Sequence, residues 1–307
     1  MKKILVLYYS QTGQLEDIAH QLLSMVETSG DVSITYEALK PRVPYPFPWT
    51  TYEFCDVFAE SVSGDTCELM PLKCHMDTDY DLIILGYTVW YLSPSIPVSS
   101  FLQSQDAIKL LKNRQVMTII GCRNMWILAQ EKVKHHLKRL NAELCGNIVL
   151  GDRAGNLTGV LTIAVWMLTG KKDRFLGLFP KPGISDDDIK ASKRFGPTIM
   201  KALGGKPIEI DQQELNRMGA VEINPALLIM EKRVAKVFNI WSAFIRKKGR
   251  QKDPSRRKRV RAFFVYLIVA IIIIAPAASL VAKLLKKIRK DALNDEIKYY
   301  MHNSFRE

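Results

Sequence analysis

Cysteine and histidine are scarce in this chain. Its 307 residues hold five cysteines, an odd number, and no two of them form a C-x-x-C pair. This usage favours reduced thiols in a reducing compartment over a disulfide framework. None of the five histidines has companions at metal-ligand spacing, so we predict no metal site. We expect His20 and the pair at 135–136 on solvated helix faces, and only His75 remains as a residue that could lie near a substrate.

Two nucleotide-binding motifs are missing after the first apolar run. Residues 2–9 predict a buried strand, and the loop behind it has neither the Gly-Lys-Ser/Thr ending of a Walker loop nor a three-glycine dinucleotide fingerprint. Free amides at the start of a helix, together with hydroxyl groups, can still bind a phosphate, and a glycine lets the backbone close around it. An ordinary Ser/Thr helix cap is the alternative. The loop residues are Ser10, Gln11, Thr12, Gly13 and Gln14.

Acidic residues are almost absent from one part of the chain. The net charge is +13, but residues 246–290 carry fifteen Lys and Arg and a single acid, Asp253. The rest of the chain is therefore nearly neutral. The positive charge flanks one hydrophobic segment and does not indicate a nucleic-acid surface, so we predict no nucleic-acid partner.

That hydrophobic segment, residues 262–282, contains no charged side chain. Its twenty-one residues are enough to span a hydrocarbon core of about 30 Å as a helix. Basic residues are more numerous on its N-terminal side than on its C-terminal side, and no secretory signal follows Lys2 and Lys3. Both features predict an N-terminal domain in the cytoplasm that is tethered to the inner (cytoplasmic) membrane. Because Pro276 can kink the helix, an in-plane monotopic anchor is the second interpretation, and a buried helix of a soluble protein is the third.

Apolar runs between helical patterns predict the fold class. Residues 79–86, 116–121 and 148–151 resemble the first strand in containing near-continuous apolar runs, which are typical of a parallel sheet covered on both faces. We therefore predict an α/β doubly wound parallel sheet with insertions, plus a C-terminal membrane helix. An amphipathic helix within residues 219–246 could lie at a membrane interface or pack on the α/β domain. The predicted parts are 1–204 with insertions 40–76 and 152–183, an amphipathic helix and basic linker over 205–261, the anchor 262–282 and a basic tail 283–307.

Three loops should converge at the carboxyl ends of the strands, where ligands of doubly wound sheets bind. The second loop contains Trp90 and Tyr91, whose rings could cover a planar ligand. Purely structural roles are the alternatives: Trp90 and Trp126 could be core aromatics, Cys122 a buried filler, and Arg123 a surface ion-pair partner. The candidate residues are Thr88, Val89, Trp90 and Tyr91 in the second loop, and Gly121, Cys122, Arg123 and Asn124 in the third.

The first loop resembles the Ser/Thr-x-Thr-Gly phosphate loop of flavodoxins, which holds the 5′-phosphate of FMN without a metal or a lysine. Members of that family usually place a third hydroxyl where Leu15 stands. Residues 88–97 look like the Trp-x-x-x-Pro flavin loop of flavodoxin-like NAD(P)H:quinone reductases. The resemblance implies bound FMN, with residues 10–14 on the phosphate, residues 88–91 beside the isoalloxazine ring, and residues 121–124 joining them.

The layout of the whole chain resembles a narrower group. Three segments look like those of the flavodoxin-like dialkylresorcinol condensing enzymes, or aromatases, of flexirubin-type gene clusters. They are the opening at residues 1–15, the insertion at 40–76, which is rich in proline and aromatic residues, and the hydrophobic segment at 262–282 with its basic flanks. That resemblance implies FMN-dependent oxidation of a lipophilic 2,5-dialkylcyclohexane-1,3-dione to a resorcinol. The expected partners are thus a lipophilic small-molecule substrate and the membrane, and a homodimer is a separate expectation. The resemblance identifies no catalytic base. The alternatives are a quinone reductase, an electron-transfer flavodoxin docked to a membrane partner, and a scaffold that has lost its cofactor.

Overall fold

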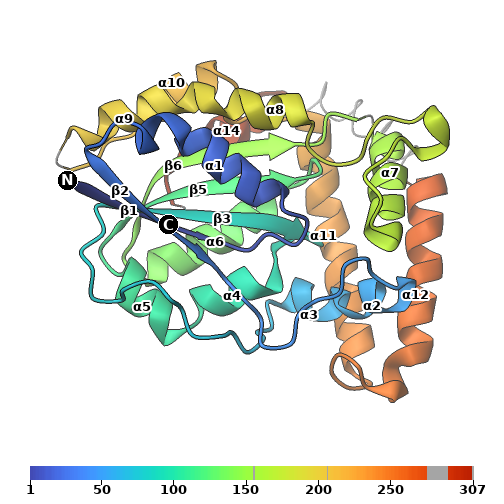
Figure 1. The fold of residues 1–307 in the computed structure, drawn as a ribbon. Helices are drawn as coiled ribbons and strands as arrows, with labels where there is room; N and C mark the ends of the chain where they lie inside the picture. The colour runs from blue at the N-terminus through green and yellow to red at the C-terminus, as the bar shows by residue number, and fades with distance from the viewer. Residues whose placement is uncertain (155, 206, 275–289, 306–307) are drawn as a thin grey trace.

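The computed structural model describes residues 1–154, 156–205, 207–274 and 290–305. Its centre is a parallel sheet with the strand order β2-β1-β3-β5-β6, and a short strand β4 pairs antiparallel with β3 outside this path (Figure 1). With β4 set aside, this is the flavodoxin-like order, which reverses direction between β1 and β3. The predicted doubly wound sheet is therefore present. The strands are β1 (Lys2–Tyr8), β2 (Val32–Ala38), β3 (Leu82–Trp90), β4 (Ser93–Pro94), β5 (Gln115–Cys122) and β6 (Glu143–Gly151).

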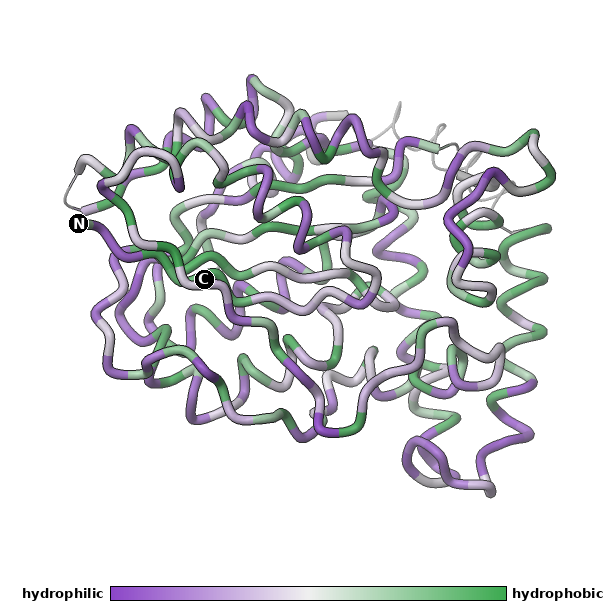
Figure 2. The backbone as a smooth tube through the Cα atoms, viewed as in Figure 1, coloured by the Kyte–Doolittle hydropathy of each residue, from purple (hydrophilic) through white to green (hydrophobic). Residues whose placement is uncertain are grey.

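Helices cover both faces of the sheet, which is why the central strand β1 is apolar on both of its faces. Ile4 and Val6 of β1 contact one helical layer, whereas Leu5 and Leu7 contact the other, and all four are fully buried. Figure 2 shows the apolar character concentrated in the central strands. The first layer consists of α1 (Gln14–Glu27), α8 (Asp186–Ala191), η2 (Ser192–Phe195), α9 (Gly196–Leu203) and α10 (Gln212–Arg217). The second consists of α4 (Ile96–Leu102), α5 (Gln105–Leu111), α6 (Ile127–Arg139) and α14 (Lys290–Tyr300).

The two predicted insertions contain helices of their own. Residues 40–76 hold α2 (Thr51–Asp56) and α3 (Phe58–Ser63), and α2 begins at a capping box between Thr50 and Glu53. Helices of six residues complete fewer than two turns, so they leave no periodic pattern in the sequence. Residues 152–183 hold α7 (Asn156–Thr169) and the short turn η1 (Phe175–Gly177).

A helical hairpin follows and packs against the first insertion (Figure 1). It comprises α11 (Pro225–Arg246), the turn η3 (Pro254–Arg256) and α12 (Arg257–Val269), which continues into the π-helical turn η4 (Ala270–Ile274). Phe263 stacks on Phe58 of α3 with ring centroids 3.8 Å apart. Arg256, the only fully buried arginine of the described residues, pairs with Asp56, at 2.8 Å, and with Glu60. The hairpin is thus held to the body of the protein by an apolar cluster and a buried ion-pair network.

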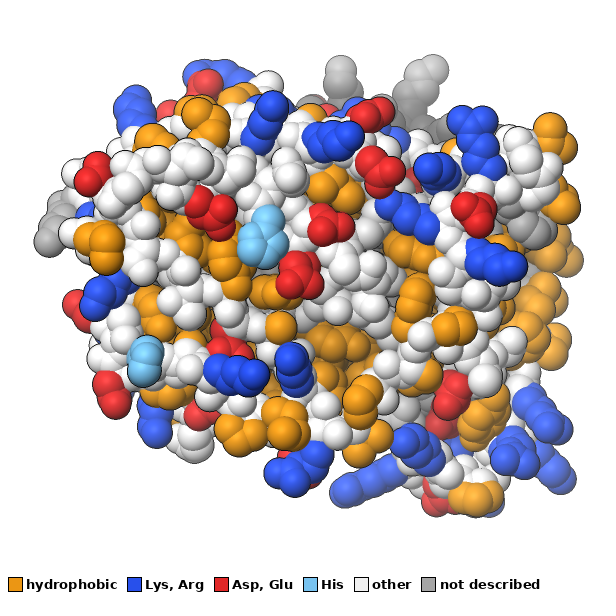
Figure 3. Space-filling view, in the orientation of Figure 1, with side chains coloured by type: hydrophobic (Ala, Val, Ile, Leu, Met, Phe, Trp, Pro, Cys, Tyr) orange, Lys and Arg blue, Asp and Glu red, His pale blue; other side chains and the backbone are white. Residues whose placement is uncertain are grey.

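Exposed basic side chains gather at the turn of this hairpin, in the lower right of Figure 3. Arg256 lies in the same stretch but is buried. The apolar surface that follows it is only partly covered, because Val260 and Phe263 of α12 are buried whereas Val265 of α12 and Ile272 of η4 are exposed. The basic run is therefore mostly a solvated surface, with one arginine used for structure. The exposed members are Arg246, Lys247, Lys248, Arg250, Lys252, Arg257, Lys258 and Arg261.

The structure corrects the prediction of a C-terminal membrane helix, and with it the predicted location in the inner membrane. Nowhere in residues 1–154, 156–205, 207–274 and 290–305 is there a helix long and apolar enough to cross a bilayer. The described part of the charge-free run, residues 262–274, divides between α12 and the turn η4, and part of its apolar surface packs on α2, α3 and α11. Composition alone does not distinguish a helix that packs on protein from one that faces lipid. Residues 275–282 of the predicted anchor and 283–289 of the predicted tail lie outside the described residues.

Candidate functional site at the strand ends

The first loop connects β1 directly to α1, and glycine occupies the cap position. Gly13 is the N-cap residue of α1 with φ of +84°, a left-handed backbone that glycine adopts without strain. Among the described residues, no side chain accepts a capping hydrogen bond at this helix start. The alternative of an ordinary Ser/Thr helix cap is therefore wrong, and the first-turn amides of α1 have no side-chain acceptor.

Two buried hydroxyl groups face the same switch point. Tyr8 of β1 pairs with Gly86 of β3, so Ser10 and Thr88 each stand two residues further along neighbouring parallel strands. Both hydroxyl oxygens are buried and have no hydrogen-bond partner among the described residues. Ser95, whose amide donates to the carbonyl of Thr88 at 2.9 Å, buries a third such hydroxyl. Buried polar groups of native proteins are rarely left unpaired, so these hydroxyls indicate a ligand or ordered water.

The two glutamines of the first loop hold it in place. Gln11 donates from Nε2 to the carbonyl of Pro46 at 2.9 Å, and Gln14 donates from Nε2 to the carbonyl of Ile184 at 2.7 Å. A Cβ on Gly183 would approach Gln14 Oε1 to 2.5 Å and the Trp166 ring to 2.7 Å. The loop is thus clamped between the first insertion and the end of the second. Gln11 and Gln14 are both candidates from the sequence. Their side chains bind these two neighbouring segments, so only their backbone amides belong to the candidate phosphate loop.

Leu15, which replaces a usual hydroxyl of the family, belongs to the core. It is 2% exposed and lies between β3 and β5, where Cβ atoms on Gly86 and Gly121 would come within 3.5 and 3.4 Å of it. Position 15 therefore contributes packing against the sheet. Gly121, a candidate of the third loop, provides room for this packing and lies near Thr88.

The second loop is a tight hairpin that sends its two aromatic residues in different directions. Val89 and Trp90 pair with Pro94 and Ser93, and the tip residues Tyr91 and Leu92 have left-handed φ of +49° and +63°. Tyr91 donates from its hydroxyl to the carbonyl of Phe54 at 2.6 Å and packs among α2, α3 and α11. The Tyr91 ring is thereby committed to the helical cluster. Val89 is half-buried against the main core.

Trp90 instead belongs to an aromatic wall whose other rings come from Tyr9, next to β1, and from the first insertion. Its ring meets Tyr9, Tyr45 and Trp49 edge-on, at centroid distances of 5.8, 5.0 and 5.7 Å. The amide of Trp49 donates to the carbonyl of Met167 at 2.7 Å, which joins the first insertion to α7. In Figure 1, α2, α3 and α7 lie beyond the arrowheads of the strands. The wall therefore lies at the end of the sheet where the three loops converge. Trp90 is a partly buried residue that packs against the core and also forms part of this wall.

The third loop packs against α7. Cys122 is half-buried, and burial raises the pKa of its thiol. Arg123 donates to Asn124 Oδ1 at 3.1 Å, and burial lowers its pKa while the nearby Asp152 opposes that shift. A Cβ on Gly159 of α7 would lie 3.4 Å from Arg123 Nε. Arg123 is therefore a covered residue beside an acid, and Trp126 is a core residue that is 4% exposed. His75 is exposed at the end of the first insertion.

The sequence interpretation missed one buried acid beside the third loop. Glu231 of α11 is 1% exposed, and its Oε1 accepts the amide proton of Leu128 at 2.7 Å, at the start of α6. Burial raises its pKa to about 7. Its position in the sequence could have revealed it, because Glu231 stands between Leu228 and Val234 on a face of α11 that is otherwise apolar.

Comparisons with known proteins yield fold likenesses only. No family model and no curated protein matches the chain. A Lactobacillus acidophilus flavoprotein, solved in complex with FMN, is 22% identical over 43% of this chain and 85% of its own, with a TM-score of 0.35. A putative flavoprotein of Bacteroides uniformis is 17% identical over 54% and 97%, with a TM-score of 0.38, and flavodoxin 1 of Bacillus cereus is 14% identical over 64% and 95%, with a TM-score of 0.34. The fold assignment rests on the strand order of this chain.

Proposed function

We propose that this chain binds FMN at the ends of β1, β3 and β5 and uses it in a redox reaction. The observation that carries the proposal is the pair of buried, unpartnered hydroxyls of Ser10 and Thr88 at the switch point, next to a helix start capped by Gly13. In flavodoxin-like sheets this switch point is the FMN site. The resemblance of residues 10–13 to the flavodoxin phosphate loop supports the same ligand.

Each group of residues has a distinct task in this proposal. The hydroxyls of Ser10 and Thr12 and the first-turn amides of α1 would hold the phosphate, because free amides and the helix dipole favour an anion. The Thr88 hydroxyl and the backbone of residues 121–124 would meet the polar edge of the ring system. Leu15 packs the helix onto the sheet, so the missing third hydroxyl leaves the phosphate to fewer side-chain donors. When bound, FMN supplies a two-electron acceptor that can take a hydride.

We infer that the substrate is a lipophilic ring compound. Tyr45, Trp49 and Trp90 form an apolar wall at the strand ends, and such a wall excludes water where a hydride is transferred. The resemblance to the aromatase group specifies the substrate further, as a dialkylcyclohexane-1,3-dione oxidised to a dialkylresorcinol. This oxidation removes two electrons and two protons from the ring, which gains aromatic stability.

The second candidate function is NAD(P)H:quinone reduction. It is favoured by the hairpin of residues 88–97, whose Trp-x-x-x-Pro spacing resembles the flavin loop of such reductases. A bare electron carrier is less compatible with the contact between the two insertions, because carriers usually leave the flavin edge open.

Anaerobic mixing separates these functions. The purified protein is expected to show a flavin spectrum and to release FMN on denaturation. A dialkylcyclohexane-1,3-dione should bleach the flavin in a single turnover and yield a resorcinol, and oxygen or a quinone should restore the colour. Rapid bleaching by NAD(P)H, with no response to the dione, would establish the quinone-reductase function instead. A protein that neither contains nor takes up FMN would contradict both.

A further inference from the structure

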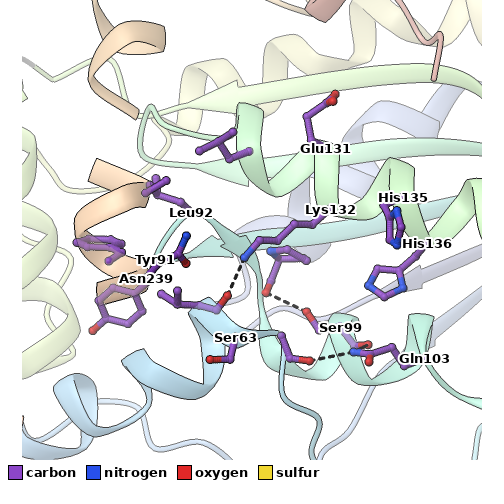
Figure 4. A pocket seen from close by; sticks show the side chains of 16 residues that line it. Ser63, Tyr91, Leu92, Ser99, Gln103, Glu131, Lys132, His135, His136 and Asn239 are labelled. Carbon is purple, nitrogen blue, oxygen red and sulfur yellow. Dashed lines mark hydrogen bonds between the residues drawn. The ribbon is translucent and has the colours of Figure 1, made fainter. Parts of the chain in front are cut away.

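A cavity of about 570 Å³ opens between α3, α4, α6 and α11, and none of the residues 10–14 or 121–124 lines it (Figure 4). Its size is in the range of small-molecule sites, about 300–1,000 Å³. One wall is the tip of the β3–β4 hairpin, Tyr91 and Leu92. The cavity is therefore separate from the proposed FMN site, although the same hairpin contributes to both.

The cavity holds a half-buried ammonium group paired only with neutral oxygens. Lys132 of α6 donates from Nζ to the carbonyl of Val62 at 2.9 Å and to the hydroxyl of Ser93 at 2.7 Å. No carboxylate of the described residues forms an ion pair with it, and burial lowers its pKa. The neighbouring Glu131 points away in Figure 4 and accepts from the Tyr299 hydroxyl at 3.1 Å. An ammonium has three donors, so one N–H of Lys132 is left for a further acceptor.

A second polar group lies one helical turn further along α6. His136 follows Lys132 at i+4, so both side chains occupy one face of the helix and line the cavity. The Nδ1 atom of His136 is buried and has no hydrogen-bond partner among the residues that the structure describes. Burial, followed by the charges of Arg139, His135 and Lys132, lowers the pKa of His136 to about 4, so its ring is neutral at pH 7 and can donate from Nδ1.

The remaining wall is mostly apolar. Its apolar part is formed by Tyr91 and Leu92 of the hairpin, Leu128 of α6, and Ala235 and Phe238 of α11. The polar side chains that line the cavity besides Lys132 and His136 are Ser63, Ser99, Gln103, Glu131, His135 and Asn239. A ligand that fits this arrangement has one anionic end and an apolar body, because a half-buried cation bonded only to neutral oxygens favours a negative partner while apolar side chains favour a hydrocarbon. Two donors on one helix face match the two oxygens of a carboxylate.

We propose that this cavity binds a small amphipathic carboxylate of the fatty-acid type. The carboxylate lies between Lys132 Nζ and His136 Nδ1, and the hydrocarbon chain lies against Leu92, Leu128 and Phe238. The bound chain contacts the strained tip of the hairpin whose base carries Thr88. The inference does not depend on FMN binding.

Calorimetric titration of the full chain with octanoate at pH 7 tests the proposal. Wild type is expected to bind octanoate at one site, and octanol at least about tenfold more weakly, because octanol lacks the charge-assisted hydrogen bonds. Lys132→Met should weaken octanoate binding by about tenfold or more. Lys109→Met, which removes the same charge from an exposed position of α5, should leave binding unchanged.

A second variant changes the shape of the cavity and keeps the positive charge of Lys132. Ala235→Phe fills the space beside Phe238 and is expected to abolish octanoate binding with Lys132 intact. Thermal melts of each variant verify that the protein is folded. No octanoate binding by wild type, equal affinity for octanol, or binding unaffected by both Lys132→Met and Ala235→Phe would overturn the proposal.

Discussion

Trp49 and Met167 are 118 residues apart in the sequence, yet the amide of one donates to the carbonyl of the other at 2.7 Å. This bond connects the two insertions across the ends of the strands. The contact of Phe47 with Trp166, ring to ring at 6.1 Å, lies beside it. The part of the aromatic wall that the first insertion supplies is therefore held against the second insertion.

Ser10→Ala is expected to lower the affinity for FMN by about tenfold, because a hydrogen bond to a charged phosphate is lost. The unfolding free energy of the FMN-free protein should stay unchanged or rise slightly, since the Ser10 hydroxyl is buried without a partner. Quenching of flavin fluorescence measures the affinity. Ser24→Ala, which removes a hydroxyl bonded within α1, is the matched control. Equal FMN affinity in wild type and Ser10→Ala would exclude this residue from the site.

Gly183→Ala is expected to cost more stability than Gly64→Ala. Both positions have a positive φ, +80° and +73°, so both variants carry backbone strain. Only at Gly183 does the new Cβ meet other atoms, at 2.5 Å from Gln14 Oε1, whereas nothing lies within 4 Å at Gly64. We expect a loss of about 1–3 kcal/mol at Gly183 beyond the control, measured by urea unfolding. FMN affinity should fall only in Gly183→Ala, because that change displaces the first loop.

Glu231 predicts a pH dependence of stability with a definite sign. Its pKa is raised from an ordinary 4.5 to about 7 in the folded protein. The folded state therefore binds the proton more tightly than the unfolded state. The contribution of Glu231 is fully present below pH 4.5 and is lost as the pH rises to about 7, with a total of about 3 kcal/mol.

Glu231→Gln should remove this part of the pH dependence, because the amide oxygen can still accept from Leu128 and carries no charge. The difference in unfolding free energy between pH 4.5 and pH 8 is the quantity to compare. The exposed Glu209→Gln provides the control. An identical pH profile in wild type and Glu231→Gln would show that the carboxyl is not perturbed by burial.

Arg256→Met is expected to destabilise the protein by about 3–5 kcal/mol, because Asp56 and Glu60 would remain buried without their cation. Lys258→Met, at an exposed position of the same basic run, should change the unfolding free energy by less than about 0.5 kcal/mol. Combining Arg256→Met with Asp56→Asn and Glu60→Gln should recover part of the loss. A triple variant less stable than Arg256→Met would contradict the assigned network.

The sheet and the convergence of the three loops could be predicted because they depend on local pattern and on topology. Near-continuous apolar runs such as the one within residues 79–86 indicate strands covered on both faces, and parallel strands must present their carboxyl ends at one edge. Ser10 and Thr88 follow from this reasoning, since each stands just after such a run.

The roles of individual side chains at the site, and the place of the C-terminal hydrophobic segment, depend on burial and on contacts between distant parts of the chain. Leu15 is a core residue because two glycines of neighbouring strands leave room for it, and Tyr91 turns into a helical cluster that its own segment does not contain. The predicted membrane helix failed for the same reason: Phe263 finds its apolar partner in Phe58, about two hundred residues earlier. Hydropathy reports how strongly a side chain avoids water, whereas the surface that it packs against is set by the path of the whole chain.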